Sequence, residues 1–131
     1  MKQMAKIVVA LSVFSLALAG PADAHVRTAN TRLSLSASDT KVHAGDQVTL
    51  TAHLRSAWKA CVRFKKINLY RYGTKVAQKK TNNKGIARYT FTAQHTAQWQ
   101  VKFKGRKWGK HPHSHRCLAS HSKTITVKVT A

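Results

Sequence analysis

Hydrophobic and polar residues alternate along most of the chain after residue 30. In QVTLTAHL (47–54), Val48, Leu50, Ala52 and Leu54 fall on one side and the residues between them fall on the other. This period of two is typical of a β-strand with one face on a core and one face in water. The pattern predicts strands over residues 31–38, 47–54, 65–72, 74–81, 86–93, 98–105 and 123–130.

Turn signals separate these segments, and no segment shows a helical period of useful length. His43–Asp46 is expected to form a turn, and Asn82–Gly85 is a strong turn signal because Asn and Gly accept positive φ. Gly105–Ser122 is expected to be a long loop, and residues 25–30 a short linker. The prediction is an all-β fold, an antiparallel β-sandwich of about seven strands.

The first 24 residues have the organisation of a secretory signal peptide. Lys2 and Lys6 precede an apolar stretch, Ile7–Leu18, and Ala22-Asp23-Ala24 supplies small residues at a cleavage site. The alternative is an uncleaved membrane anchor, although the apolar stretch is short for a membrane-spanning helix. Cleavage after Ala24 leaves 131 − 24 = 107 residues, which predicts a secreted, single-domain protein over 25–131 without a transmembrane span.

Several motifs resemble the bacterial Ig-like modules of secreted and cell-surface proteins, especially those of actinobacteria. The matching stretches are Gly45–Leu50, Ile67–Arg71, Asn82–Thr92, Thr96–Gly105 and Thr124–Val129. The resemblance implies an Ig-like sandwich with an adhesive, spacer or wall-associated role and no catalytic residues. This chain differs from the usual pattern because its module stands alone and is extremely basic.

The charge of the chain is strongly one-sided. Without residues 1–24 the chain has 24 − 2 = 22 Lys and Arg residues against Asp39 and Asp46, and it has no Glu. Nineteen of these 22 cations lie from Arg55 onward. Such a charge attracts polyanions. It also argues against catalysis by paired carboxylates, and the G-x-S-x-G motif is absent, so we expect no enzymatic activity.

Basic and aromatic residues together favour binding of an anionic polymer. A run of charges is often only a solvated face, but a net charge of 22 − 2 = +20 makes some polyanion affinity hard to avoid. For an exported protein the expected partners are wall polysaccharide, teichoic acid or, without base specificity, nucleic acid. The candidate residues are Lys59, Arg63, Lys65, Lys66, Arg71, Lys79, Lys80, Lys102, Lys104, Arg106, Lys107, Lys110, Trp58 and Trp108.

The two cysteines, Cys61 and Cys117, are predicted to form a disulfide because an exported chain meets an oxidising environment. Their spacing closes a loop of 117 − 61 = 56 residues, worth about 4 kcal/mol on the chain-entropy model. The alternative is a reactive or metal-binding thiol.

Four histidines suggest an alternative function, the binding of copper or zinc. His111, His113 and His115 alternate, so an extended backbone would point them the same way, and His25 would be the amino terminus after cleavage. Against this, the chain offers few carboxylates to orient the ligands, and the neighbouring cations repel a metal ion. The other interpretation of these histidines is a solvated basic loop that is held by Cys117.

The leading hypothesis is therefore a secreted, basic, Ig-like module that binds anionic envelope or extracellular polymers without catalysis and needs no cofactor. The first alternative is an exported copper- or zinc-binding protein. The second is a cationic antimicrobial protein that disrupts membranes.

Overall fold

The computed structural model describes residues 25–110 and 112–131, so the expected signal peptide, residues 1–24, and His111 lie outside the described residues. The described chain is almost entirely β-structure, as predicted, with one 3-10 turn, η2 (Lys59–Cys61). Within this part of the chain no helix is long and apolar enough to cross a membrane.

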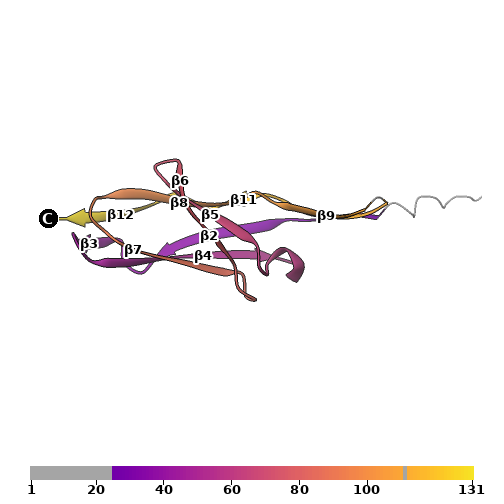
Figure 1. The fold of residues 1–131 in the computed structure, drawn as a ribbon, viewed down its shortest axis with the longest axis horizontal. Helices are drawn as coiled ribbons and strands as arrows, with labels where there is room; N and C mark the ends of the chain where they lie inside the picture. The colour runs from indigo at the N-terminus through magenta and orange to yellow at the C-terminus, as the bar shows by residue number, and fades with distance from the viewer. Residues whose placement is uncertain (1–24, 111) are drawn as a thin grey trace, which may run out of the picture.

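Two sheets pack face to face to form the sandwich (Figure 1). The first has the order β2-β4-β7. The second has the order β3-β12-β8-β5-β6, and the short strand β11 also pairs with β8. The bounds are β2 (Thr31–Ala37), β3 (Lys41–His43), β4 (Gln47–Ser56), β5 (Lys66–Arg71), β6 (Thr74–Lys80), β7 (Ile86–Thr92), β8 (Ala97–Phe103), β11 (Ser120–His121) and β12 (Ile125–Thr130).

The core lies between the sheets and follows the alternation of the sequence. Val48, Leu50, Ala52 and Leu54 of β4 are all 0% exposed, and the residues between them reach the outer face. The hydroxyl of Tyr89 on β7 donates to the Ile67 carbonyl on β5 at 2.7 Å, which joins the two sheets. The antiparallel sandwich is therefore confirmed, with one parallel exception where β12 meets β3.

The prediction that Gly105–Ser122 forms a long loop is wrong. It contains β9 (Arg106–Lys110) and β10 (His113–Cys117), which pair with each other, and β11. The expected linker before Thr31 is also wrong, because β1 (His25–Ala29) pairs in parallel with β10. These strands carry polar residues on both faces, so they lack the hydrophobic alternation that predicts a strand.

The β1-β10-β9 sheet extends beyond one end of the sandwich, as Figure 1 shows, while β3 and the carboxyl terminus lie at the other end. A disulfide joins Cys61 of η2 to Cys117 of β10, with a Cα–Cα distance of 5.6 Å, so the predicted pairing is confirmed. Both cysteines are buried. The disulfide fixes the base of the extended sheet against the connection that follows β4.

Candidate functional site

The outer face of the six-stranded sheet carries a pocket lined by cations. Its volume is about 530 Å³, and its walls include Lys65, Lys66, Lys80, Lys104 and Arg106. These residues lie at the adjoining ends of β5, β6 and β8 and at the start of β9. Because β5 lies between β6 and β8 and alternate residues of a strand share a face, distant parts of the sequence meet here. We call this surface the basic pocket.

A pair of side-chain amides forms part of the basic pocket. Asn68 on β5 lies directly opposite Gln78 on β6, and Gln78 Nε2 donates to Asn68 Oδ1 at 2.6 Å. Both residues line the pocket, although Asn68 is only 2% exposed. The pocket therefore combines long cationic side chains with a neutral amide that is bonded to Gln78.

The cations of the basic pocket are close to one another and lack carboxylate partners. Lys66 and Lys80 lie directly opposite on β5 and β6, where like charges destabilise a strand pair. No lysine or arginine of the described residues is within ion-pair distance of a carboxylate. Repulsion in this pocket is therefore relieved only by solvent, dissolved ions or an anionic ligand.

The electrostatics of Lys65 reflect this crowding. Partial burial lowers the pKa of its amine, and the positive charges of Arg106 and Arg63 lower the pKa further. An anion placed at Lys65 would act in the opposite direction, because an opposite charge favours the protonated amine.

A second concavity brings together the aromatic residues that the sequence singled out. Trp58 and Trp108 both pack against His115, with ring centroids 5.7 and 5.4 Å from the imidazole. The guanidinium of Arg27 lies 5.8 Å from the Trp58 ring centroid. Together with Lys59 these residues line a cleft of about 430 Å³, which we call the aromatic cleft.

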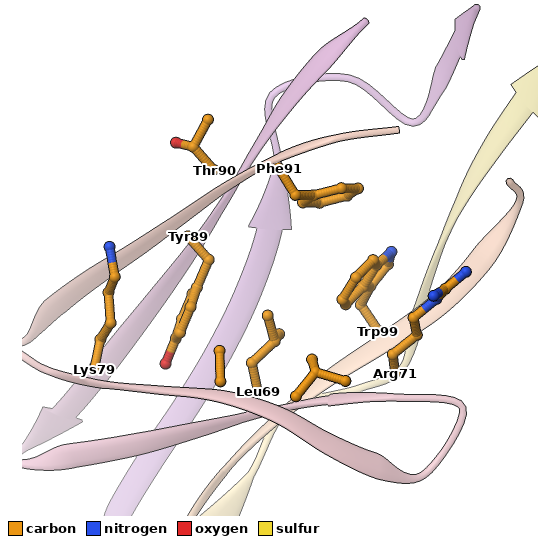
Figure 2. Close-up of a pocket in the computed structure, with 9 residues that line it drawn as sticks. Leu69, Arg71, Lys79, Tyr89, Thr90, Phe91 and Trp99 are labelled. Atoms are coloured by element: carbon orange, nitrogen blue, oxygen red, sulfur yellow. The ribbon is translucent and has the colours of Figure 1, made fainter. Parts of the chain in front are cut away.

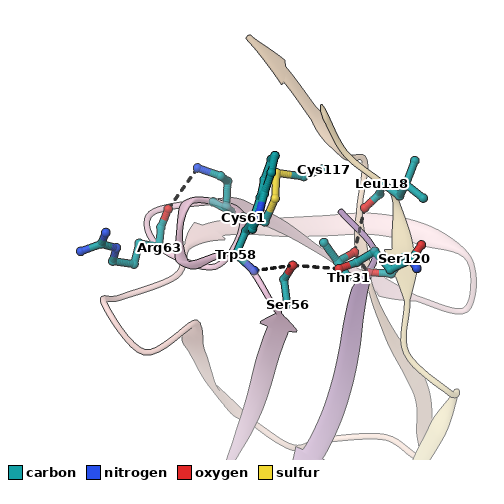
Figure 3. Close-up of a disulfide and its surroundings, with 10 residues drawn as sticks. Thr31, Ser56, Trp58, Cys61, Arg63, Cys117, Leu118 and Ser120 are labelled. Carbon is teal, nitrogen blue, oxygen red and sulfur yellow. Dashed lines mark hydrogen bonds between the residues drawn. A yellow bond between two sulfur atoms is a disulfide. The ribbon is translucent and has the colours of Figure 1, made fainter. Parts of the chain in front are cut away.

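Several contacts hold Trp58 at the base of the extended sheet (Figure 3). The Trp58 backbone N–H donates to the hydroxyl of Ser56 at 3.2 Å, and the Cys61 backbone N–H donates to the Trp58 carbonyl at 3.0 Å. Cys61 is in turn bonded to Cys117, two residues after His115. The disulfide therefore brings the connection that carries Trp58 to the strand that carries His115.

Lys65 connects the two concavities. Lys65 lines the basic pocket, while its amine donates to the Arg63 carbonyl at 3.2 Å and lies 5.8 Å from the ring centroid of Trp108. Arg106, another residue of the basic pocket, is two positions before Trp108 on β9. A ligand of several units could therefore contact cations in one concavity and aromatic rings in the other.

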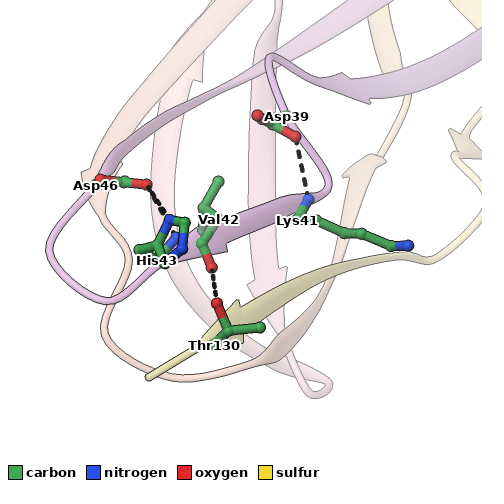
Figure 4. A network of polar contacts seen from close by, with 6 residues as sticks. All are labelled: Asp39, Lys41, Val42, His43, Asp46 and Thr130. Carbon is green, nitrogen blue, oxygen red and sulfur yellow. Dashed lines mark hydrogen bonds and ion pairs between the residues drawn. The ribbon is translucent and has the colours of Figure 1, made fainter.

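The two described aspartates lie far from these surfaces and make local contacts around β3 (Figure 4). Asp39 accepts a hydrogen bond from the Lys41 backbone N–H at 3.1 Å. Asp46 accepts one from the His43 backbone N–H at 2.9 Å and approaches the His43 ring at 3.8 Å. Both flank β3, at the opposite end of the molecule from β9 in Figure 1. Both aspartates therefore lie away from the basic pocket, and Lys41 and Lys128 pair on β3 and β12 at the same end as the aspartates.

An apolar pocket of about 340 Å³ opens between the sheets at the edge formed by β6 and β7 (Figure 2). Phe91 and Trp99 face each other there, with ring centroids 4.5 Å apart. The charged groups of Arg71 and Lys79 lie 5.9 Å from the ring centroids of Trp99 and Tyr89, respectively. Arg71 and Lys79 therefore lie over aromatic rings at the edge of the core and are not part of the basic pocket.

The remaining predicted residues fall into distinct places. Lys102 lies on the same outer face as the basic pocket, with its amine 4.7 Å from the Tyr70 ring centroid. Arg63 and Lys59 line a further pocket of about 580 Å³ near the turn before β7. Lys107 and Lys110 are exposed on β9. The structure thus places five of the predicted cations in one pocket and distributes the others over the surface.

The predicted metal ligands are only partly described. His25 lies opposite His113 in the backbone register of β1 and β10, and His115 belongs to the aromatic cleft. His111 lies outside the described residues. Among the residues that the structure describes, no group of three or more His, Cys, Asp or Glu side chains is arranged to hold a metal ion.

Sequence reasoning missed several residues of these surfaces, among them Arg27 of the aromatic cleft. Asn68 and Gln78 occupy outward positions of their strands, so alternation gave no reason to expect that Asn68 is buried and bonded to the exposed Gln78. Phe64 lines the basic pocket, is 60% exposed and has a φ of 55°, which is unusual for a bulky residue. The one feature of the sequence that pointed to Phe64 was its position between Arg63 and Lys65, just before a predicted strand.

The chain matches no protein-family model, and searches of curated proteins and of solved structures found no similar protein. The Ig-like resemblance therefore stays a prediction, and the strand order is compatible with it.

Proposed function

We propose that this protein is a secreted, non-enzymatic module that binds anionic polymers of the cell envelope or the extracellular space. The observation that carries the proposal is the basic pocket, in which five cations meet without a carboxylate among the lining residues. Polymers of the expected kind are teichoic acids, acidic wall polysaccharides and, without base readout, nucleic acids.

The mechanism is electrostatic capture followed by local contacts. The net positive charge draws a polyanion toward the basic face, and binding releases counterions from the polymer. Lys66, Lys80 and Lys104 then replace solvent around the anionic groups. Trp58 and Trp108 supply flat apolar surfaces for the uncharged parts of the polymer, and Lys65 lies between the two regions.

The proposal is tested by measuring the affinity of protein that starts at His25 for poly(glycerol phosphate), polygalacturonate and neutral dextran over a range of salt concentrations. We expect binding to both charged polymers, with affinity falling steeply as salt is added, and no binding to dextran. Equal affinity for dextran, or no binding to either charged polymer at low salt, would contradict the proposal. Dye release from anionic vesicles would instead support the antimicrobial alternative.

A second candidate function is copper binding, and the β1–β10 pairing favours it because it sets His25 opposite His113. A free α-amine and an imidazole at His25 would supply two nitrogen ligands, which suit copper. The test is calorimetric titration of copper into protein that starts at His25 and into protein with one extra residue before it. Tight one-to-one binding by the first protein alone supports this candidate. Weak binding to several sites in both proteins contradicts it.

A further inference from the structure

Asn68 is buried at a position where the strand pattern places an outward-facing residue. Its neighbours Ile67 and Leu69 point into the core, so Asn68 belongs to the outer face, yet it is only 2% exposed. Gln78 occupies its Oδ1 with a hydrogen bond of 2.6 Å. Among the described residues no hydrogen-bond partner takes the Asn68 NH₂ group. Trp99 Nε1 is the only buried side-chain nitrogen or oxygen without a partner among the described residues, so the Asn68 NH₂ reaches solvent in the pocket. There it is open to a hydrogen-bond acceptor.

The surroundings of this amide select a negatively charged acceptor. Lys66 precedes Asn68 by two residues on the same face, Lys80 lies opposite Lys66, and Lys104 lines the same pocket. Lys65 and Arg106 complete the cationic wall. A neutral acceptor would leave the mutual repulsion of these cations unchanged, whereas an anion reduces it.

We propose that the basic pocket binds a phosphate group, with the Asn68 NH₂ as a fixed donor and Lys66, Lys80 and Lys104 as surrounding charges. This inference rests on the proposed function and narrows it, because it makes the preferred polymer one that carries phosphate. Four of the five cations are lysines, which bind phosphate as point charges. Only Arg106 offers the planar fork that matches a carboxylate in two parallel hydrogen bonds.

The directions of the donors also favour phosphate over carboxylate. The lysines approach from β5, from β6 and from the segment after β8, while Asn68 lies between them on the central strand. A phosphate spreads its acceptor oxygens tetrahedrally and can receive donors from several sides. A carboxylate has two oxygens in one plane and satisfies fewer directions. The pocket volume of about 530 Å³ leaves room for the adjoining polymer backbone.

The direct test is nuclear magnetic resonance of nitrogen-labelled protein that starts at His25, titrated with inorganic phosphate and separately with acetate at constant ionic strength. We expect a saturable shift of the Asn68 side-chain NH₂ signals with phosphate, at about tenfold lower concentration than with acetate, as one extra hydrogen bond to a charged group implies. Equal responses to the two anions, or shifts that leave Asn68 unchanged, would overturn the inference.

Two variants that each add one negative charge separate binding in the basic pocket from attraction by the net charge of the protein. Asn68→Asp replaces the donor by a carboxylate of the same shape, whereas Gln98→Glu adds a carboxylate at an exposed position of β8. Phosphate binding should fall at least tenfold in Asn68→Asp and less than twofold in Gln98→Glu. Similar losses in both would show that only net charge matters. If Asn68→Asp fails to fold, Lys104→Gln compared with Lys75→Gln makes the same comparison.

The polymers distinguish this inference from the proposed function. Poly(glycerol phosphate) should bind more tightly than polygalacturonate of equal charge, and Asn68→Asp should remove most of the difference. Equal affinities that are unaffected by Asn68→Asp would contradict the phosphate inference and leave the proposed function standing. Absence of binding to both polymers would remove the proposed function itself. Binding of single-stranded DNA as tight as that of poly(glycerol phosphate) would support phosphate recognition independent of the polymer.

Discussion

Lys66 and Lys80 lie directly opposite each other on β5 and β6, with the Asn68–Gln78 amide pair as the next pair on the same face. Opposed like charges on neighbouring strands weaken the pairing of those strands. Neither lysine has a carboxylate partner among the described residues. The fold therefore carries a local electrostatic cost at the point where we place the ligand, which is the relationship expected of a binding surface.

Replacing Lys80 by Gln should consequently stabilise the protein and weaken ligand binding. At low salt we expect the free energy of unfolding to rise by about 0.5 kcal/mol, and the gain should disappear at high salt as repulsion is screened. Urea unfolding at two salt concentrations measures this effect. Lys75→Gln, which changes the same charge opposite Tyr70, is the control and should change little. A loss of stability in Lys80→Gln at low salt would contradict the account.

Phe64 is held in a backbone conformation that suits glycine, with a φ of 55°. Because its side chain is 60% exposed, Phe64→Gly loses little packing and removes the strain. The variant should be more stable by about 1 kcal/mol in urea unfolding. Val76→Gly, at an exposed position of β6, is the control and should be less stable. A destabilised Phe64→Gly would mean that the ring packs more than its exposure indicates.

The disulfide should account for a large part of the stability of the fold. Its closed loop spans a sequence separation of 56 residues, so reduction should lower the free energy of unfolding by about 4 kcal/mol. Urea unfolding with and without reductant measures this difference. The double variant Cys61→Ala and Cys117→Ala should be equally destabilised and insensitive to reductant. A loss below about 1 kcal/mol would show that β10 is held mainly by its strand partners.

Reduction should also disturb the aromatic cleft, because the disulfide holds η2 against β10. We expect the tryptophan fluorescence of Trp58 and Trp108 to change before global unfolding, while Trp99 in the core keeps its environment. Trp58→Phe and Trp108→Phe variants assign the signal. An unchanged emission spectrum on reduction under native conditions would contradict this prediction.

Tyr89 should make the fold sensitive to alkali. Burial raises the pKa of its hydroxyl to about 12, whereas the unfolded value is about 10. The unfolded chain therefore loses this proton first, so the contribution is complete below about pH 10 and is lost as pH rises toward about 12, with a total of roughly 2 to 3 kcal/mol. The measurement is the difference in unfolding free energy between the wild type and Tyr89→Phe across this range.

The Tyr89→Phe variant also loses the hydrogen bond to the Ile67 carbonyl. It should be less stable than the wild type by about 1 kcal/mol at neutral pH. The difference should shrink as pH rises and change sign near about pH 11, because only the wild type carries the ionising group and loses more than the hydrogen bond contributes. A constant difference up to about pH 12 would show that Tyr89 ionises without cost in the fold.

Most of the sandwich could be predicted because its strands have one face exposed to solvent and one face in the core. Leu50 and Leu54 on β4, and Val101 on β8, are buried at the positions that alternation assigns to the core. The disulfide was predictable from the even number of cysteines and the expected export. These features depend on local pattern or on simple counting, which the sequence carries directly.

The extended sheet and the amide pair could not be predicted in the same way. Strands β9 and β10 lie beyond the sandwich and bury little on either face, so alternation is weak, and the parallel pairing with β1 joins segments far apart in sequence. Asn68 lies on the outer face of β5 between Gln78 of β6 and Lys102 of β8 and is only 2% exposed. The burial of Asn68 depends on which strands flank β5, and local sequence pattern does not give this strand order.

The central claim is that the basic pocket, and not the net charge alone, binds the polymer. The most direct test compares two triple variants with the same charge: Lys66→Gln, Lys80→Gln and Lys104→Gln in the pocket, and Lys41→Gln, Lys75→Gln and Lys128→Gln outside it. Affinity for poly(glycerol phosphate) is measured at one salt concentration. We predict that the pocket variant loses at least about tenfold more affinity than the other variant. Equal losses would contradict the account, because they would mean that any three cations of this surface are equivalent.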